Sequence, residues 1–183
     1  MATREIIKMG NPILRQGATP LTKEEILSEE TQDLILEMRE VMKEAEGIGL
    51  AAPQIGISKH LAIIEVPGES RYEESTPTEL IVFINPQIKV IDETKQGFWE
   101  GCLSVPGLRG FVERPRKIQI DYLNELAEEV SIIAEDFLAT VFQHEIDHLN
   151  GILYVDKITD MTKLSYNEEY VKYHLEEGES FDE

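Results

Sequence analysis

Apolar residues recur at helical spacing in two stretches of the chain. Residues 31–46 carry an apolar stripe of Leu34, Met38, Val41 and Ala45, widened by Ile35 and Met42. Residues 136–149 carry two neighbouring stripes: Phe137, Val141, His144 and His148, then Leu138, Phe142, Glu145 and Leu149. Because both flanks of the second segment are largely apolar, it is expected to form a helix buried at the centre of the protein.

Short runs rich in Ile, Val and aromatic residues predict β-strands over residues 61–66, 80–91, 98–105, 116–123 and 129–134. Residues 117–122 alternate most strictly between polar and apolar. Helices early and late, with strands between them, favour the α+β class over repeating βαβ units. The expected architecture is antiparallel or mixed sheets packed around the central helix of residues 136–149.

The length of 183 residues predicts a single domain spanning residues 1–183. Residues 67–79 are polar and rich in turn formers, which predicts a surface loop. Residues 172–183 are acidic and are expected to form a partly disordered tail.

Charge narrows the classes of partner. Lys and Arg number 17 against 36 Asp and Glu, a formal net charge of −19. Such a surface repels nucleic-acid phosphates and anionic lipids, so neither DNA nor a membrane is an expected partner. A single cysteine, no signal-peptide pattern and no run of ~18 apolar residues predict a cytoplasmic protein.

The second helix carries the sequence His144-Glu145-Ile146-Asp147-His148, an HExxH pattern. Histidines four residues apart lie on the same helix face, so both imidazoles can bind one metal ion. The glutamate can serve as general base toward a water molecule at the metal. A hydrogen-bonded pair of core histidines is the alternative interpretation.

A catalytic site of this type needs a third protein ligand. The metzincin pattern would place a histidine at position 154, which is Tyr154, so that pattern fails. The gluzincin pattern would use Glu168, about twenty residues after the second histidine. Cys102 is the third candidate, because thiolate binds zinc and iron strongly, although a lone cysteine is commonly a small buried apolar residue.

Two upstream segments have distinctive compositions. Residues 100–106 surround the cysteine. Gly101 predicts a backbone conformation or a close approach that a side chain would forbid, and Pro106 predicts the end of a strand. Residues 47–54, Gly-Ile-Gly-Leu-Ala-Ala-Pro-Gln, are small or apolar except for the last one, Gln54, which has an amide side chain. They indicate either tight backbone packing or a smooth wall for an extended peptide.

Together the three segments resemble the signature motifs of peptide deformylase, GxGxAAxQ, EGCxS and HExDH. These motifs occur here in that order, at residues 47–54, 100–104 and 144–148. The resemblance extends from about residue 6 to residue 158. It implies hydrolysis of the N-formyl group from formyl-methionine at the start of new polypeptides, releasing formate. A gluzincin-type metallopeptidase and a non-enzymatic metal-stabilised domain remain the competing hypotheses.

The resemblance also implies roles for individual residues. Cys102, His144 and His148 would hold one divalent metal ion, commonly Fe(II), although Zn, Ni and Co suit the same donors. Glu145 would be the general base. The Gln54 side chain and the Leu103 backbone N–H would stabilise the negative oxygen of the tetrahedral intermediate.

Substrate contacts follow by the same resemblance. Ile48 and Gly49 would offer backbone hydrogen bonds to an extended peptide, and Arg109 would contact the substrate backbone. The methionine pocket would be lined by Ile48, Phe98, Phe137 and Val141, for which plain core packing is an equally good reading. Glu100 and Arg114 would form an ion pair that holds the cysteine segment.

Two histidines and the C-terminal end of the chain lie outside the three motifs. His60 and His174 match no motif and are expected to be structural or surface residues. Some bacterial members of the family dock on the ribosome through a basic C-terminal helix, whereas residues 168–177 here are acidic. The substrate implies transient proximity to the ribosome, but the acidic end opposes that docking mode.

Overall fold

The computed structural model describes residues 4–66 and 77–175. The helices are α1 (Lys23–Ile26), α2 (Glu29–Glu44), α3 (Asp136–Leu149) and α4 (Asn167–Tyr173). The strands are β1 (Gly49–Ala51), β2 (Leu61–Ile64), β3 (Ile81–Cys102), β4 (Val105–Leu123), β5 (Glu129–Glu135) and β6 (Leu164–Tyr166). Short 3-10 helices span Pro12–Arg15, Ala52–Ile55, Tyr154–Lys157 and Met161–Lys163.

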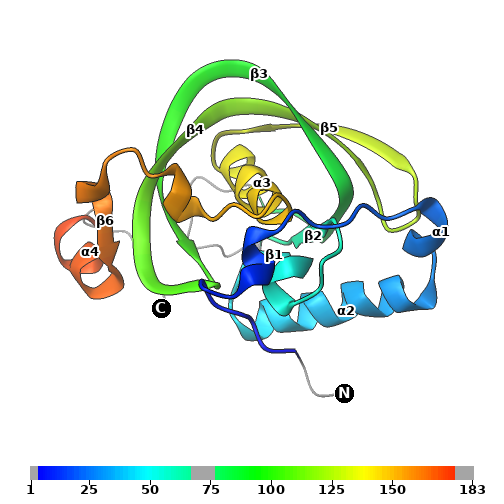
Figure 1. The fold of residues 1–183 in the computed structure, drawn as a ribbon. Helices are drawn as coiled ribbons and strands as arrows, with labels where there is room; N and C mark the ends of the chain where they lie inside the picture. Colours follow the sequence, from blue (N-terminus) through cyan, green and yellow to red (C-terminus); the bar gives the residue numbers. More distant parts are fainter. Residues whose placement is uncertain (1–3, 67–76, 176–183) are drawn as a thin grey trace.

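All pairings between these strands are antiparallel, in the order β1-β2-β3-β4-β5, and β6 also pairs with β4. The long β3–β4 hairpin arcs around α3 (Figure 1). Register shifts along β3, including those between Val90 and Asp92 and between Asp92 and Lys95, supply the irregularities that let a strand bend. The α+β class with an antiparallel sheet agrees with the expectation from the sequence.

The strand boundaries differ from those predicted. Residues 80–91 and 98–105 were expected to be separate strands, but β3 runs through the polar residues between them. Those residues pair with β4, for example Lys95 with Pro115, so backbone pairing rather than apolar alternation continues the strand. The chain then turns at Leu103 and Ser104, and Val105 already belongs to β4. Residues 116–123 are only the second half of β4.

Helix α2 begins earlier than predicted, at Glu29, because the Ser28 side chain caps it by accepting a hydrogen bond from the Thr31 N–H. It ends at Glu44, and Glu46 takes the left-handed conformation with φ 54°. The helix therefore ends before Gly47. A Cβ at that position would lie 2.9 Å from Leu103 Cδ1, so the glycine permits contact with the turn between β3 and β4.

Helix α3 has ten buried residues among its fourteen. Its apolar side chains pack against the sheet, as in the contact between the Phe83 and Phe142 rings at 5.1 Å. A second apolar cluster joins α2 to β1 and β2. Full burial of one such side chain is worth ~1.5–3 kcal/mol, so these clusters hold α3 and β1 rigidly beside each other.

The predicted loop and tail fall partly outside the described residues. Residues 67–76 lie outside them; at the base of this segment the Thr78 N–H donates to the Val66 carbonyl at 2.9 Å. Lys172 and Tyr173 belong to α4, so the predicted tail begins too early, and residues 176–183 lie outside the described part.

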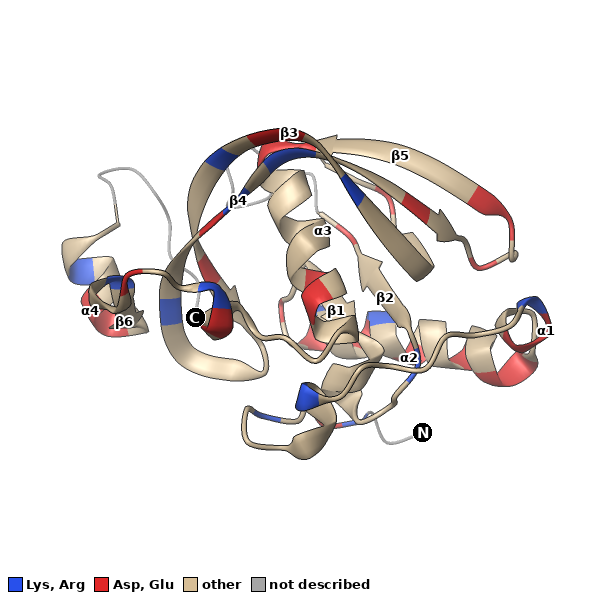
Figure 2. Ribbon diagram, turned by 45° about the horizontal axis from the view of Figure 1, so that its top comes forward, with Lys and Arg blue, Asp and Glu red and all other residues tan. Residues whose placement is uncertain are grey.

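Acidic side chains are spread over α1, α2 and α4 (Figure 2). No helix in residues 4–66 and 77–175 combines the length and apolar character needed to span a membrane.

Candidate active site

Three potential metal ligands meet where β3 ends against α3. The Cys102 sulfur and one ring nitrogen from each of His144 and His148 all lie within 4.8 Å of one another. Cys102 Sγ is 3.3 Å from His148 Nε2. Burial, and then the charges of His144 and Arg114, hold the pKa of His148 well below its usual range. At His144 burial is outweighed by hydrogen bonds with Cys102 and Glu100, which hold its pKa well above that range. One sulfur and two imidazole donors in reach of a single point fit a divalent transition metal.

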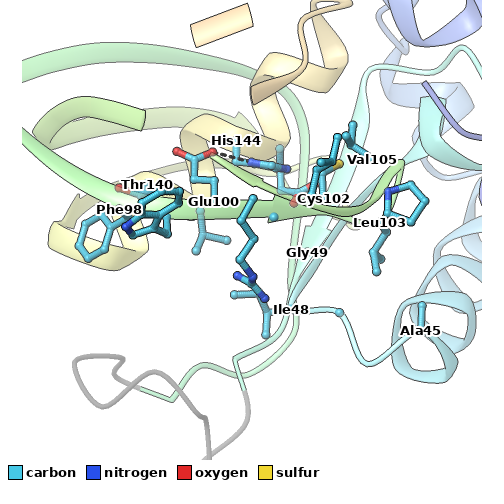
Figure 3. A pocket seen from close by; sticks show the side chains of 18 of the residues that line it. Ala45, Ile48, Gly49, Phe98, Glu100, Cys102, Leu103, Val105, Thr140 and His144 are labelled. Atoms are coloured by element: carbon cyan, nitrogen blue, oxygen red, sulfur yellow. Dashed lines mark hydrogen bonds and ion pairs between the residues drawn. The ribbon is translucent and has the colours of Figure 1, made fainter. Parts of the chain in front are cut away.

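A buried ion pair fixes the first histidine. Arg114 donates from Nε to Glu100 Oε1 at 2.6 Å and from Nη2 to Oε2 at 3.0 Å. Glu100 Oε2 also lies 2.8 Å from His144 Nδ1, the interaction drawn in Figure 3. Burial alone would raise the pKa of Glu100, but hydrogen bonds with His144 and Arg114 outweigh it and hold the pKa below its usual range. The carboxylate therefore stays charged and orients the imidazole, leaving Nε2 to face the cysteine.

Arg114 also reaches a second carboxylate. Its Nη1 donates to Asp147 Oδ2 at 2.8 Å, and the Arg114 side chain is only 5% exposed. One guanidinium thus ties the end of β3 to the turn of α3 that carries the two histidines. Arg114 sits on β4, so three elements are joined at this point.

Glu145 is a buried carboxyl group beside the three ligands. It is 5% exposed, and its Oε2 has no hydrogen-bond partner among the described residues. Burial raises its pKa to about 7. The group lies against the backbone of β1, since a Cβ on Gly49 would meet Glu145 Oε1 at 2.4 Å. A carboxyl group that titrates near neutrality in a pocket is suited to proton transfer.

The Gln54 amide is oriented by its neighbours. Its Oε1 accepts from the Ala51 N–H at 2.8 Å, which leaves Nε2 facing Ser104 Oγ at 3.3 Å and Cys102 Sγ at 3.6 Å. The amide thus presents N–H donors toward the cysteine.

Leu103 and Ser104 form the two-residue turn between β3 and β4. The N-terminal segment holds this turn, because Lys8 Nζ donates to the Leu103 carbonyl at 3.0 Å and the Met9 N–H donates to the Ser104 carbonyl at 2.7 Å. The Ile7 N–H in turn donates to the Gln54 carbonyl at 2.8 Å. One short strap therefore fixes the first and second motifs relative to each other.

Five of these residues border a pocket of about 230 Å³: Gln54, Cys102, Leu103, His144 and Glu145. Phe98 and Thr140 stand toward one end of it and Leu103 and Ala45 toward the other, with Ile48 and Gly49 along the wall between (Figure 3). Four residues named from the sequence as apolar lining, together with the arginine, all border it: Ile48, Phe98, Phe137, Val141 and Arg109.

Comparison with known proteins shows the family of the chain. The model of the family described as polypeptide deformylase matches residues 3–164. The chain belongs to the polypeptide deformylase family. The peptide deformylase of Leptospira biflexa serovar Patoc is 44% identical over 170 residues, which cover 92% of this chain and 95% of that protein. That of Halothermothrix orenii is 47% identical over 158 residues, 86% of this chain and 95% of its relative.

A solved structure gives the same result. The Met-Ala-Ser-bound class I type b peptide deformylase of Acinetobacter baumannii superposes with a TM-score of 0.82 at 37% identity, covering 86% of this chain and 99% of that one. The deformylase described here is thus an enzyme that removes the N-formyl group from nascent peptides. Deformylases depend on a metal, and the cysteine–histidine cluster is a site that could hold one.

The gluzincin alternative is not favoured for this deformylase. Glu168 is exposed on α4 and does not belong to the cluster of ligand atoms, which contains Cys102 instead. Two smaller expectations were wrong. A Cβ at Gly101 would meet Arg109 only at an ordinary 3.5 Å, and Pro106 lies inside β4 rather than at a strand end.

Other residues received no role, or no specific one, from the sequence. Asp147 lies inside the third motif, but no local pattern indicates its hydrogen bond with Arg114 on β4. Asn167, which borders the pocket, had no motif at all. His60 is half-buried, with its pKa lowered by burial, and the His174 ring packs on Trp99 at 4.8 Å.

Proposed function

We propose that Cys102, His144 and His148 bind one divalent metal ion in this deformylase, most naturally Fe(II), with Zn, Ni and Co as substitutes. One observation carries the proposal: a buried carboxyl oxygen of Glu145, without a partner among the described residues, borders the same pocket as Cys102 and His144 of the sulfur–imidazole cluster. When bound, the ion lowers the pKa of a water molecule and polarises the formyl carbonyl. Three protein ligands leave a further position open for substrate or water.

Glu145 is the proposed general base and then general acid. It takes a proton from the attacking water and later gives it to the departing methionine nitrogen. A pKa of about 7 supports both steps, because the group can accept and release a proton at neutral pH. Gly49, which has no side chain, leaves room for the carboxylate against β1.

Gln54 and the Leu103 N–H are the proposed donors to the oxygen that becomes negative in the transition state. The hydrogen bond from Ala51 to Gln54 Oε1 supports this role, because it leaves the amide N–H group facing the cysteine. Each such donor is typically worth ~3–4 kcal/mol of transition-state stabilisation. With a thiolate among its ligands, a bound metal would be a weaker Lewis acid, so these two donors would carry more of the stabilisation.

The substrate peptide is proposed to bind extended beside β1. This strand is the terminal one in the sheet order, so a peptide can add to it as a further strand through Ile48 and Gly49. The methionine side chain would enter the apolar part of the pocket formed by Ile48, Phe98, Phe137 and Val141. Arg109 would contact the peptide backbone. The related Acinetobacter baumannii enzyme with bound Met-Ala-Ser supports a peptide of this length.

The pair of Glu100 and Arg114 is proposed to position His144 and the cysteine strand, not to react. A buried pair of this kind seldom adds net stability, whereas removing one partner leaves a buried charge. Its value lies in orienting the imidazole.

We infer that residues 1–183 act as one catalytic domain, built around α3, in the cytoplasm. Proximity to the ribosome follows from the substrate alone. Glu168 and Glu169 in the first turn of α4 add to the net charge of −19 and support the absence of a nucleic-acid docking surface there.

Two substitutions test the ligand set. Cys102→Ala is expected to abolish both tight metal binding and formate release, while Glu168→Ala keeps both at the wild-type level. Metal content after anaerobic purification and turnover of a formyl-Met tripeptide are the measurements. Metal that survives loss of Cys102 but not loss of Glu168 would contradict the assignment.

A further inference from the structure

A buried polar atom on α4 borders the pocket and is not used by the proposed chemistry. Asn167 Oδ1 is inaccessible to solvent and has no hydrogen-bond partner among residues 4–66 and 77–175. The residue contributes to the pocket wall. Buried polar atoms are almost always satisfied, so an orphan acceptor at a binding pocket indicates a donor that arrives with the ligand.

Strand pairing puts Asn167 beside one stretch of the pocket wall. In the β4–β6 register Tyr166 is opposite Leu108 and Ser165 is opposite Arg109. The next residue, Asn167, therefore lies beyond Leu108 toward Gly107, and both of these also line the pocket. Asn167 is thus part of the wall formed with the start of β4, the strand that also carries Arg109, the arginine proposed to contact substrate.

Aromatic contacts hold α4 in this position. Trp99 of β3 packs on Tyr170 with ring centroids 5.0 Å apart, and on His174 at 4.8 Å. The guanidinium carbon of Arg109 lies 5.5 Å from the centre of the Tyr170 ring. Tyr170 is 8% exposed. The helix that carries Asn167 is therefore a fixed part of the wall, although it lies beyond residue 164, where the family model ends.

We propose that Asn167 accepts a hydrogen bond from a backbone N–H of the substrate, at a residue that follows the formyl-methionine. The inference rests on the proposed function, since it extends the same peptide site. An extended peptide beyond its first side chain presents N–H donors at regular intervals, and a neutral amide oxygen pairs with them regardless of sequence. This would let the enzyme grip nascent chains of any sequence and distinguish them from formyl-methionine alone.

The test compares substrates of increasing length in wild-type enzyme and in Asn167→Leu, which keeps the side-chain size but removes the acceptor. Formyl-methionine methyl ester has no N–H beyond the methionine; formyl-Met-Ala-Ser and a tetrapeptide have several. The variant is expected to raise KM about 3- to 10-fold for the longer peptides, as for one lost neutral hydrogen bond, and to leave the methyl ester and kcat unchanged. Asn167→Asp, which keeps an acceptor oxygen, should have KM values closer to those of wild type. Glu169→Gln, on the exposed side of α4, should have the KM values of wild type.

A depsipeptide series, with one amide at a time replaced by an ester, identifies the N–H concerned. At one position the ester should raise the KM of wild-type enzyme by the same factor and leave the KM of Asn167→Leu unchanged. Equal KM values for wild type and Asn167→Leu on every substrate would overturn the inference, as would an equal loss on the methyl ester. If metal-loaded wild-type enzyme released no formate at all, the proposed function would fail instead. Calorimetric binding of Met-Ala-Ser would then test the inference separately. Weaker binding to Asn167→Leu than to wild type would support it, and equal binding would overturn it.

Discussion

Burial of the Glu145 carboxyl has a measurable thermodynamic cost. Its pKa rises from 4.5 to about 7 in the folded chain because burial disfavours the charged form. At ~1.36 kcal/mol per pH unit, this difference corresponds to about 3 kcal/mol. The folded state holds the proton more tightly than the unfolded state, so stability is highest below pH 4.5, falls as pH rises toward 7, and stays at the lower value above it.

Glu145→Gln replaces the carboxyl group with a neutral one of the same shape and removes this pH dependence. In metal-free protein, the free energy of unfolding of the variant relative to wild type should increase by about 3 kcal/mol between pH 4.5 and pH 8. Urea denaturation of chelator-treated protein at several pH values measures it. All other titrating groups are shared, so the difference between the two curves reports Glu145.

A matched control is the same change at Glu113, an exposed residue of β4. Glu113→Gln should follow the wild-type pH dependence throughout. Parallel curves for wild type and Glu145→Gln would refute the reasoning, because they would mean that the carboxyl group is not held in its neutral form by burial.

Three further predictions concern other parts of the site. Gly49→Ala places a methyl group 2.4 Å from an oxygen of the proposed base, so kcat should fall at least tenfold (~1.4 kcal/mol) with the metal retained. Gly17→Ala, whose methyl group would have no atom within 4 Å, should leave kcat unchanged. Arg114→Met leaves two buried carboxylates without their partner and should cost about 3–5 kcal/mol of stability in chemical denaturation; Arg116→Met, which breaks an exposed pair, should leave the midpoint near wild type. Iron-loaded enzyme should lose activity in air as the metal and Cys102 oxidise, and equal half-lives under air and argon would contradict that.

Much of the architecture followed from local patterns. The period of apolar residues predicted α3 with its observed limits, because that helix is buried on nearly every side and its sequence shows it. β3 was predicted as two strands, since its polar middle is stabilised by pairing with β4 rather than by burial of its own side chains. The start of α4 went unassigned and its end was taken for part of a tail, because the contact of Tyr170 with Trp99 joins residues far apart in sequence.

The site divides in the same way. Three local motifs named residues that the fold brings together at one site, since each motif has its own backbone conformation and side-chain chemistry. The second carboxylate on Arg114 and the orphan oxygen of Asn167 had no such local signal. Both depend on which strands and helices meet, and that becomes visible only in the folded chain.

We propose that the pocket hydrolyses the formyl group of a formyl-methionyl peptide with Glu145 as the base. The most direct measurement is formate release from formyl-Met-Ala-Ser by enzyme loaded with Fe(II) without oxygen, beside Glu145→Gln with the same metal content. We expect one formate and one free methionine amine per peptide for wild-type enzyme, and a loss of turnover of at least a hundredfold in the variant (~2.7 kcal/mol in the barrier). Metal-loaded wild-type enzyme without formate release, or a variant as active as wild type, would contradict it.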